Sequence, residues 1–155
     1  MVLEDYVWIN KNIVKNKFPI PLMDDLLDEL HSSSIFSKID LRARYNQVRM
    51  DLGDVYNMTF KNYARHYEYI VMPFGLTNTP TTFQRLTNSV FLAISTKFSV
   101  VFFNDILIYN TYLGAYLHHL SQVFLVLREN SLFAKKSKCF FVVNRVEYLG
   151  HFISK

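Results

Sequence analysis

Two apolar runs that meet at one polar pair constrain the fold of this chain more than any other segment. Residues 99–109 are rich in β-branched and aromatic side chains, and their polar centre is Asn104 and Asp105. Two such runs joined by a short polar turn predict a tight β-hairpin. Asp105 would then lie at the tip of two buried strands.

A second apolar run, residues 35–41, also ends near a lone aspartate, Asp40. A carboxylate at the end of a hydrophobic strand is costly to desolvate unless it binds a cation. The two runs therefore favour a metal-dependent phosphoryl-transfer site, and the amide of Asn104 indicates that this site is damaged. The residues alone leave an alternative open, because Asp40 is also typical of a turn and Asn-Asp of an ordinary hairpin turn in which Asn tolerates positive φ.

Composition limits the class of protein. The 155 residues suffice for one domain or a piece of a larger one, and the 50% hydrophobic content supports a sizeable core. A formal net charge of +4 is compatible with a polyanionic partner and equally with an ordinary basic surface. The single cysteine excludes an internal disulfide.

The first residues and the hydropathy pattern predict an intracellular protein without a membrane span. Acidic residues occupy the start, where a secretory signal would carry basic ones. No apolar run approaches the roughly 18 residues that a membrane span requires.

The pattern of apolar residues predicts an α+β fold, in which an antiparallel sheet carries helices on one face. Its open face would carry Asp40 and Asp105. Helices are expected over 23–30, from 79 to about 95 with Thr77 or Asn78 as cap, and from 117 to about 130. Further strands are expected at 47–50, 58–60, 67–72, 132–134, 139–143 and 146–153. The inward faces of the two later helices are expected to carry Phe83, Leu86, Val90 and either Phe91 or Ala93 on the first, and Leu120, Phe124 and Leu127 on the second.

Three longer motifs make the chain similar to a known family. They are residues 36–42 (FSKIDLR), 67–78 (YEYIVMPFGLTN) and 146–151 (VEYLGH). In order and spacing, from about residue 4 to residue 154, the chain resembles the reverse transcriptase of gypsy-type long-terminal-repeat retrotransposons, as a degenerate copy.

The resemblance implies the palm of a right-hand polymerase with part of the fingers. The whole chain, 1–155, would be one partial reverse transcriptase domain. Residues 1–34 and about 46–75 would be fingers-like, and residues 35–45 and 76–155 would be palm. The thumb, ribonuclease H and integrase regions are expected in the remainder of the Pol polyprotein and not in this chain.

The chemistry that the resemblance implies is addition of a deoxynucleotide (dNTP) to a primer 3′-hydroxyl along an RNA or DNA template. Two Mg²⁺ ions, with Mn²⁺ as an alternative, would be held by three aspartates. The matching metal positions are Asp40, Asp105 and the backbone carbonyl of Leu41, and Asn104 stands in the third aspartate position.

The resemblance also implies contacts with substrates. Tyr45 would lie beneath the sugar of the incoming nucleotide, and Phe74 and Gly75 would line the nucleotide pocket. The template and primer contacts would be Gln84 and Arg85 for the template strand, and Tyr148, Leu149, Gly150 and His151 for the primer end.

Departures from the family pattern predict impaired catalysis. Asn104 removes one of three anionic metal ligands. Arg44 and Arg65 stand at turns where the family has glycine, so backbone strain is expected there. The alternatives are a non-catalytic nucleic-acid-binding remnant and a retroelement fragment without function. By family, the expected location is a cytoplasmic particle or the nucleus, and no oligomeric state is specified.

Overall fold

The computed structural model describes residues 6–16, 18, 30, 33–62, 64–94 and 98–154. The chain divides into two units. One comprises Met1–Phe18 and Ala43–Phe83, and the other comprises Pro19–Arg42 and Gln84–Lys155. The helix expected over 23–30 lies outside the described residues, apart from its last position.

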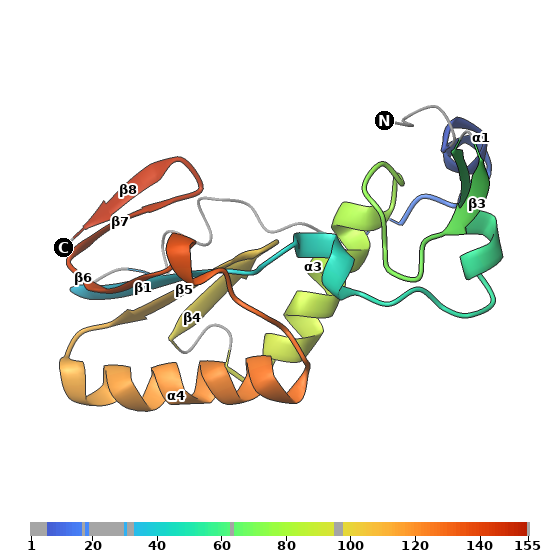
Figure 1. Cartoon of the computed structure of the whole chain (residues 1–155). Coiled ribbons are helices and arrows are strands. Elements are labelled where there is room, and N and C mark those ends of the chain that lie inside the picture. The colour runs from blue at the N-terminus through green and yellow to red at the C-terminus, as the bar shows by residue number, and fades with distance from the viewer. Residues whose placement is uncertain are drawn as a thin grey trace. The chain divides into compact units, whose positions relative to one another are not determined.

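A four-stranded antiparallel sheet forms the centre of the second unit (Figure 1). Its strands lie in the order β4 (Ser99–Phe102), β5 (Asp105–Asn110), β1 (Ile35–Asp40) and β6 (Phe140–Val143). The apolar run at 35–41 forms β1, and the run at 99–109 forms β4 and β5. Strands β1 and β5 lie in the middle of the sheet, where both faces are covered and apolar side chains are needed on both. The α+β fold is therefore confirmed.

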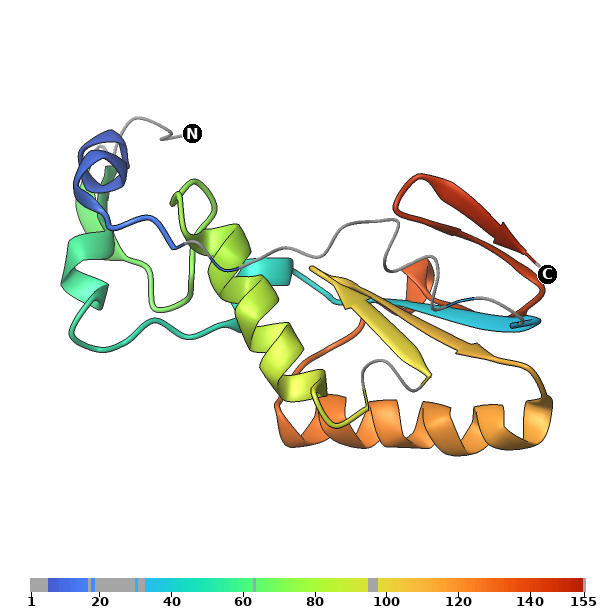
Figure 2. The ribbon, with the colours of Figure 1, turned by 180° about the vertical axis from the view of Figure 1, so that it is seen from behind.

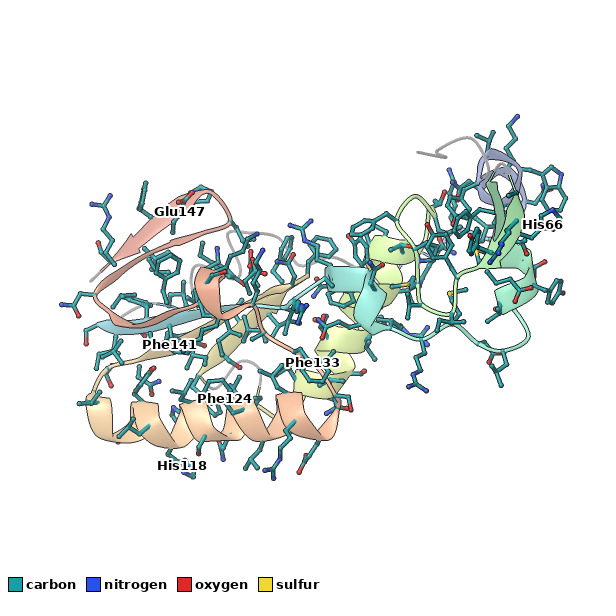
Figure 3. The ribbon with its side chains drawn as sticks, viewed as in Figure 1. His66, His118, Phe124, Phe133, Phe141 and Glu147 are labelled. Atoms are coloured by element: carbon teal, nitrogen blue, oxygen red, sulfur yellow. The ribbon has the colours of Figure 1, made fainter. Side chains whose placement is uncertain are left out.

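One face of this sheet is covered by α4 (Leu113–Glu129), as Figures 1 and 2 show. Tyr116, Val123 and Leu127 form the buried stripe of the helix. Leu127 is buried as predicted, but Val123 takes the inward position one turn before it, and the adjacent Phe124 is turned about 100° away. The prediction that Phe124 points inward is wrong: it lies at the surface beside Phe141 of β6, with ring centroids 6.3 Å apart (Figure 3).

The opposite face is not fully open, which corrects the sequence-based expectation. A hairpin of β7 (Arg145–Tyr148) and β8 (His151–Ser154) packs over it. The hydrophobic cluster on this face comprises Leu30, Phe36, Val100, Leu107, Tyr109, Val146 and Tyr148. The expected strand at 132–134 is reduced to a single bridge between Leu41 and Ala134.

The face under α4 also holds a histidine. His119 stacks on Phe98 with ring centroids 3.8 Å apart, and its Nδ1 lies 2.7 Å from Oδ1 of Asn110. Burial, and secondarily the neighbouring His118, lower the pKa of His119. Figure 3 shows His118 on the outer side of α4, so the two adjacent histidines have different environments.

Helix α3 (Thr79–Phe91) ends before the predicted residue 95. Phe83 is buried as expected, but so are the polar residues Gln84 and Thr87, while Leu86 and Val90 are only half-buried. The inward face therefore differs from the predicted one.

Asn78 was one of two predicted capping residues for α3, but its side chain forms other hydrogen bonds. The Nδ2 of Asn78 donates to the Val14 carbonyl, and its Oδ1 accepts the Asn16 N–H, so the side chain fastens the N-terminal segment.

The first unit contains α1 (Val7–Asn12), the hairpin of β2 (Thr59–Asn62) and β3 (Arg65–Glu68), and two short 3-10 helices, η1 (Arg44–Gln47) and η2 (Val55–Met58). The strand predicted at 67–72 lies earlier in the chain, at Arg65–Glu68. The strand predicted at 47–50 is wrong, and a single bridge between Arg49 and Val71 is found in its place. The cause is the backbone after β1, where Ala43 and Arg44 have φ of 56° and 41° and turn the chain into η1.

Of the two predicted strain positions, Arg44 is confirmed and Arg65 is not, because Arg65 lies in extended backbone at the start of β3. Within the described part of the chain, no helix combines the length and apolarity needed to cross a membrane.

Candidate functional site

Asp40 and Asp105 are direct cross-strand partners in the pairing of β1 with β5. Directly opposed residues project from the same face of a sheet, with Cβ atoms about 5 Å apart. Their side chains are 15% and 19% exposed, respectively. Two stretches of chain 65 residues apart therefore bring their carboxylates together at one end of the sheet.

The hairpin that carries Asp105 has a two-residue turn. Phe102 of β4 pairs with Asp105 of β5, which leaves Phe103 and Asn104 as the turn. Phe103 has the positive φ, 50°. The sequence interpretation gave that role to Asn104, because Asn tolerates positive φ; the structure places it on a bulky residue instead.

Gln84 of α3 contacts this turn from inside the unit. Its Oε1 accepts the Phe103 N–H at 2.6 Å, and its Nε2 donates to the Val101 carbonyl at 3.3 Å and to Oδ1 of Asn88 at 2.6 Å. The side chain is 0% exposed. A direct template contact by Gln84, as the resemblance implied, is contradicted by this burial, because no surface of the side chain faces solvent.

Asn104 is the second residue of the turn and lies beside Asp105. Its Nδ2 donates to Oδ1 of Asp105 at 3.2 Å, and its backbone carbonyl accepts the Leu41 N–H at 2.8 Å. The amide thus brings no charge to the site and also occupies one acceptor of Asp105. Leu41 contacts Asn104 through its backbone N–H, and metal binding by its carbonyl stays a prediction.

Two lysines balance the carboxylates. Lys38 Nζ lies 3.7 Å from Oδ2 of Asp105, and Lys138 Nζ lies 3.7 Å from Oδ2 of Asp40. Lys38 precedes Asp40 by two positions on β1, which places both on one face. Lys138 belongs to η3 (Lys136–Lys138). Neither lysine is among the predicted site residues, although the two-residue period of a strand indicates that Lys38 shares a face with Asp40.

The donor set suits a hard divalent cation. Two carboxylates, an amide oxygen and a peptide carbonyl offer oxygen ligands of the kind that Mg²⁺ prefers. Among the residues that the structure describes, no group of three or more His, Cys, Asp and Glu side chains could hold a metal ion. The residues present fit such an ion with two anionic ligands in place of three.

Tyr148 supports the same hairpin from the other side. It is fully buried, and its hydroxyl donates to the carbonyls of Asp105 at 3.2 Å and Val100 at 3.4 Å. Burial, and secondarily the Asp105 charge, raise the pKa of Tyr148 well above its ordinary value. A direct primer contact by this side chain is therefore contradicted in the same way as for Gln84.

The remaining predicted contacts of the second unit lie at the surface. Leu149 and Gly150, with φ of 53° and 83°, form the two-residue turn of the β7–β8 hairpin. Gly150 and His151 are exposed, Leu149 is half-buried, and Arg85 is exposed on α3.

In the first unit, the predicted nucleotide-pocket residues lie together. The Tyr45 ring is 5.1 Å from that of Phe74 and 5.4 Å from that of Phe83. Phe74 is exposed, and Gly75 has a φ of 100°. The Asn10 side chain donates to the Gly75 carbonyl at 2.8 Å, which fixes this turn.

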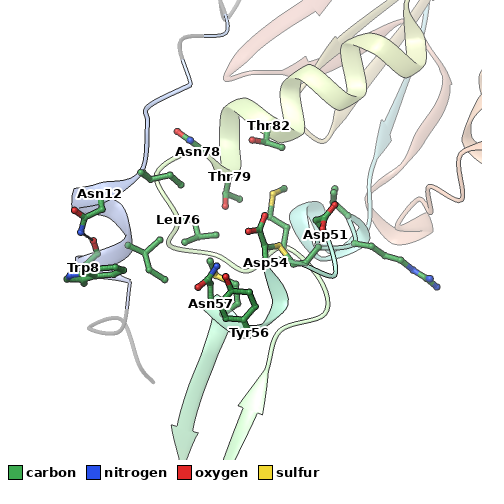
Figure 4. A pocket seen from close by; sticks show the side chains of 17 residues that line it. Trp8, Asn12, Asp51, Asp54, Tyr56, Asn57, Leu76, Asn78, Thr79 and Thr82 are labelled. Carbon is green, nitrogen blue, oxygen red and sulfur yellow. Dashed lines mark hydrogen bonds between the residues drawn. The ribbon is translucent and has the colours of Figure 1, made fainter.

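The first unit also has a cavity of about 930 Å³ (Figure 4). Trp8, Asp54, Tyr56 and Leu76 are among its lining residues. Tyr45, Phe74 and Gly75 are not part of this lining, so the cavity and the predicted nucleotide contacts are separate features.

The sheet, the helix on one face and the carboxylates at a hairpin turn define a polymerase palm-like α+β fold. A family model described as "Reverse transcriptase (RNA-dependent DNA polymerase)" matches residues 2–153. The chain belongs to this reverse transcriptase family, which confirms the resemblance seen in its motifs.

Curated relatives place the chain among retrotransposon Pol proteins. It is 35% identical over 153 residues to the "Retrovirus-related Pol polyprotein from transposon 297" of Drosophila melanogaster, with 99% of this chain and 14% of that protein covered. It is 31% identical over 151 residues to the "Transposon Tf2-3 polyprotein" of Schizosaccharomyces pombe, covering 97% of this chain and 11% of the relative. The chain therefore spans a small part of these relatives.

Solved structures show the same fold. The foamy viral protease-reverse transcriptase in complex with RNA/DNA hybrid matches with a TM-score of 0.87 and 21% identity, covering 97% of this chain and 20% of that one. A second structure of that enzyme, in complex with ds DNA, matches with a TM-score of 0.88 and 21% identity, covering 97% and 26%.

Proposed function

We propose that this domain carries the metal-dependent nucleotidyl-transfer site of a reverse transcriptase, impaired by Asn104. The observation that carries the proposal is the direct pairing of Asp40 with Asp105 beside the β4–β5 turn. Two carboxylates so close together repel each other, and a divalent cation held between them would offset that repulsion more strongly than the two lysines at 3.7 Å do.

Asp40, Asp105 and the Leu41 carbonyl would hold the divalent ions, two in the intact family site. When bound, Mg²⁺ or Mn²⁺ would lower the pKa of the primer 3′-hydroxyl and stabilise charge on the leaving pyrophosphate. Asn104 contributes a neutral oxygen where a third carboxylate is expected. Loss of that charge costs at least about 3 kcal/mol of transition-state stabilisation, roughly a hundredfold in rate.

The proposed substrates are an RNA or DNA template-primer and a dNTP. Solved foamy viral relatives hold RNA/DNA hybrid and ds DNA, which supports this class of ligand. Tyr45, Phe74 and Gly75 would contact the nucleotide. Arg85 would contact the template, and the exposed tip at Gly150 and His151 would contact the primer. Residues 1–34 and 46–75 would serve as fingers and the rest as palm, within a longer Pol polyprotein.

Primer extension tests the proposal. The chain and its Asn104→Asp variant would be assayed with Mg²⁺ and with Mn²⁺, and Asn104→Asp should extend the primer at least about a hundredfold faster. Asn144→Asp is the matched control, because Asn144 is exposed between β6 and β7 and the charge change is identical. Equal rates for the chain and the repaired variant with both metals would refute the proposed impairment.

A second candidate is a remnant that binds nucleic acid without catalysis. Lys38 and Lys138 already neutralise the two carboxylates, which leaves the net charge of +4 to attract a polyanion. Binding of an RNA/DNA duplex that weakens linearly with the logarithm of salt concentration, with no extension by Asn104→Asp, would favour this candidate.

A further inference from the structure

Gln84 is a buried polar side chain whose hydrogen bonds converge on the β4–β5 turn. It is 0% exposed, and burial of an amide is costly unless its donors and acceptors are used. Its Oε1 is committed to the Phe103 N–H and its Nε2 to the Val101 carbonyl. Both bonds end on the backbone of the hairpin that carries Asp105.

Two backbone groups determine which way the Gln84 amide points. The Phe103 N–H can only donate and the Val101 carbonyl can only accept, so Oε1 faces the turn and Nε2 faces β4. Asn88, four residues further along α3, supports this orientation, because its Oδ1 accepts from Gln84 Nε2 at 2.6 Å.

The Phe103 N–H that Gln84 accepts belongs to a strained residue. A φ of 50° is unfavourable for a bulky L residue, so the turn needs an external contact to hold it. Asn104 follows directly, and its carbonyl accepts the Leu41 N–H beside Asp40. A shift of Phe103 would thus move residues 104 and 105 relative to Asp40.

We infer that Gln84 is a positioning residue, which holds the Phe103–Asn104 turn so that positions 104 and 105 face Asp40 at metal-binding distance. The part of this inference that concerns metal binding rests on the proposed function. The part that concerns the turn rests on the hydrogen bonds of Gln84 alone. Gln84 acts from beneath the site and needs no contact with template or nucleotide.

The experiment measures two quantities in the full 155-residue chain carrying Asn104→Asp. The first is the Mn²⁺ dissociation constant, from electron paramagnetic resonance. The second is hydrogen exchange at the Phe103 amide, from NMR. The test variant is Gln84→Met, which keeps the side-chain volume and removes the amide. The control is Phe91→Leu, a buried apolar change two turns further along α3, which tests for general destabilisation.

Gln84→Met should weaken Mn²⁺ binding by about 10- to 100-fold, the usual effect of losing a residue that orients metal ligands. It should also increase the rate of hydrogen exchange at the Phe103 amide. Phe91→Leu should lower the unfolding temperature by a similar amount, but it should change the Mn²⁺ dissociation constant and the Phe103 exchange rate by no more than about twofold. Gln84→Glu should keep most of the Mn²⁺ affinity and most of the protection of the Phe103 amide, because a fully buried carboxyl group is protonated and retains an acceptor for the Phe103 N–H.

The outcomes separate this inference from the proposed function. Unchanged Phe103 exchange in Gln84→Met overturns the inference even if Mn²⁺ binds. Equal weakening of Mn²⁺ binding in Gln84→Met and Phe91→Leu also overturns it. Absence of Mn²⁺ binding in Asn104→Asp itself overturns the proposed function, and Phe103 exchange in the unaltered chain then still decides whether Gln84 holds the turn.

Discussion

Replacement of Lys38 by methionine should strengthen divalent-metal binding, although it removes a cation from a site proposed to handle phosphates. Lys38 Nζ lies 3.7 Å from Asp105 Oδ2, where it supplies the positive charge that a metal would otherwise supply. A bound ion must displace or repel this ammonium group. Methionine keeps the apolar stem of the side chain and removes that competition, together with the hydrogen bond of 3.3 Å from Lys38 Nζ to the Glu147 carbonyl.

The magnitude follows from the geometry. Two unit charges about 4 Å apart interact by about 1 kcal/mol in water and about 4 kcal/mol at an effective dielectric constant of 20. Both side chains are 19% exposed, and the lysine can swing toward solvent, so the lower part of that range applies. An effect of about 1.4 kcal/mol corresponds to about tenfold tighter Mn²⁺ binding.

The assay is Mn²⁺ titration of Asn104→Asp with and without Lys38→Met, followed by thermal unfolding. Without metal, Lys38→Met should lower the unfolding temperature, because Asp40 and Asp105 then face each other with less compensation. Added Mn²⁺ should raise it more than in the parent. Lys136→Met is the control, since Lys136 is exposed and makes no ion pair within the described residues. Unchanged or weaker Mn²⁺ binding in Lys38→Met, or an equal gain in Lys136→Met, would refute the reasoning.

Three further predictions concern stability. Arg44→Gly should raise the free energy of unfolding by about 1 kcal/mol in urea denaturation, because the φ of 41° suits glycine; a loss would show that the Arg44 side chain has a compensating role. Tyr148→Phe should lower that free energy by about 1 kcal/mol, since it leaves the buried Asp105 carbonyl without its hydroxyl donor; no change in urea denaturation would contradict this. The lowered pKa of His119 means that the unfolded chain binds a proton near pH 6.5 more readily than the folded chain. The free energy of unfolding should therefore be highest above pH 6.5 and should decrease as the pH falls below 6.5. In thermal unfolding, His119→Gln should make this decrease smaller. If the pH dependence of the unfolding temperature is the same in His119→Gln, His119 is not its cause.

Much of the sheet could be predicted from local pattern. The apolar run at 35–41 fills β1 and the run at 99–109 fills β4 and β5, and the polar pair in the middle of the second run predicts the hairpin between them. The helices α3 and α4 were predicted with boundaries a few residues off. On α4, Leu127 was predicted correctly and Phe124 wrongly, because Phe124 is as apolar as the buried Val123 beside it and only the packing partner decides between them.

The two carboxylates of the candidate site could be predicted from the sequence, but the residues that pair with them and hold the turn could not. Asp40 and Asp105 stand at the ends of apolar strands, which is a local signal. Lys138, which forms an ion pair with Asp40, lies almost one hundred residues further along the chain. The spacing of residues near Asp40 therefore cannot predict this pair. The positive φ at Phe103 likewise depends on an acceptor from another element.

The amino-acid sequence by itself determined the family, the α+β class and the two acidic positions, because each rests on residue type and spacing along the chain. Only the tertiary structure decided that Asp40 and Asp105 are direct partners, and that Gln84 and Tyr148 are buried beneath the hairpin rather than exposed to ligand. The physical reason is that a polar side chain is stable in the interior only when its hydrogen-bond partners are present. Those partners come from distant segments that meet only when the chain has folded.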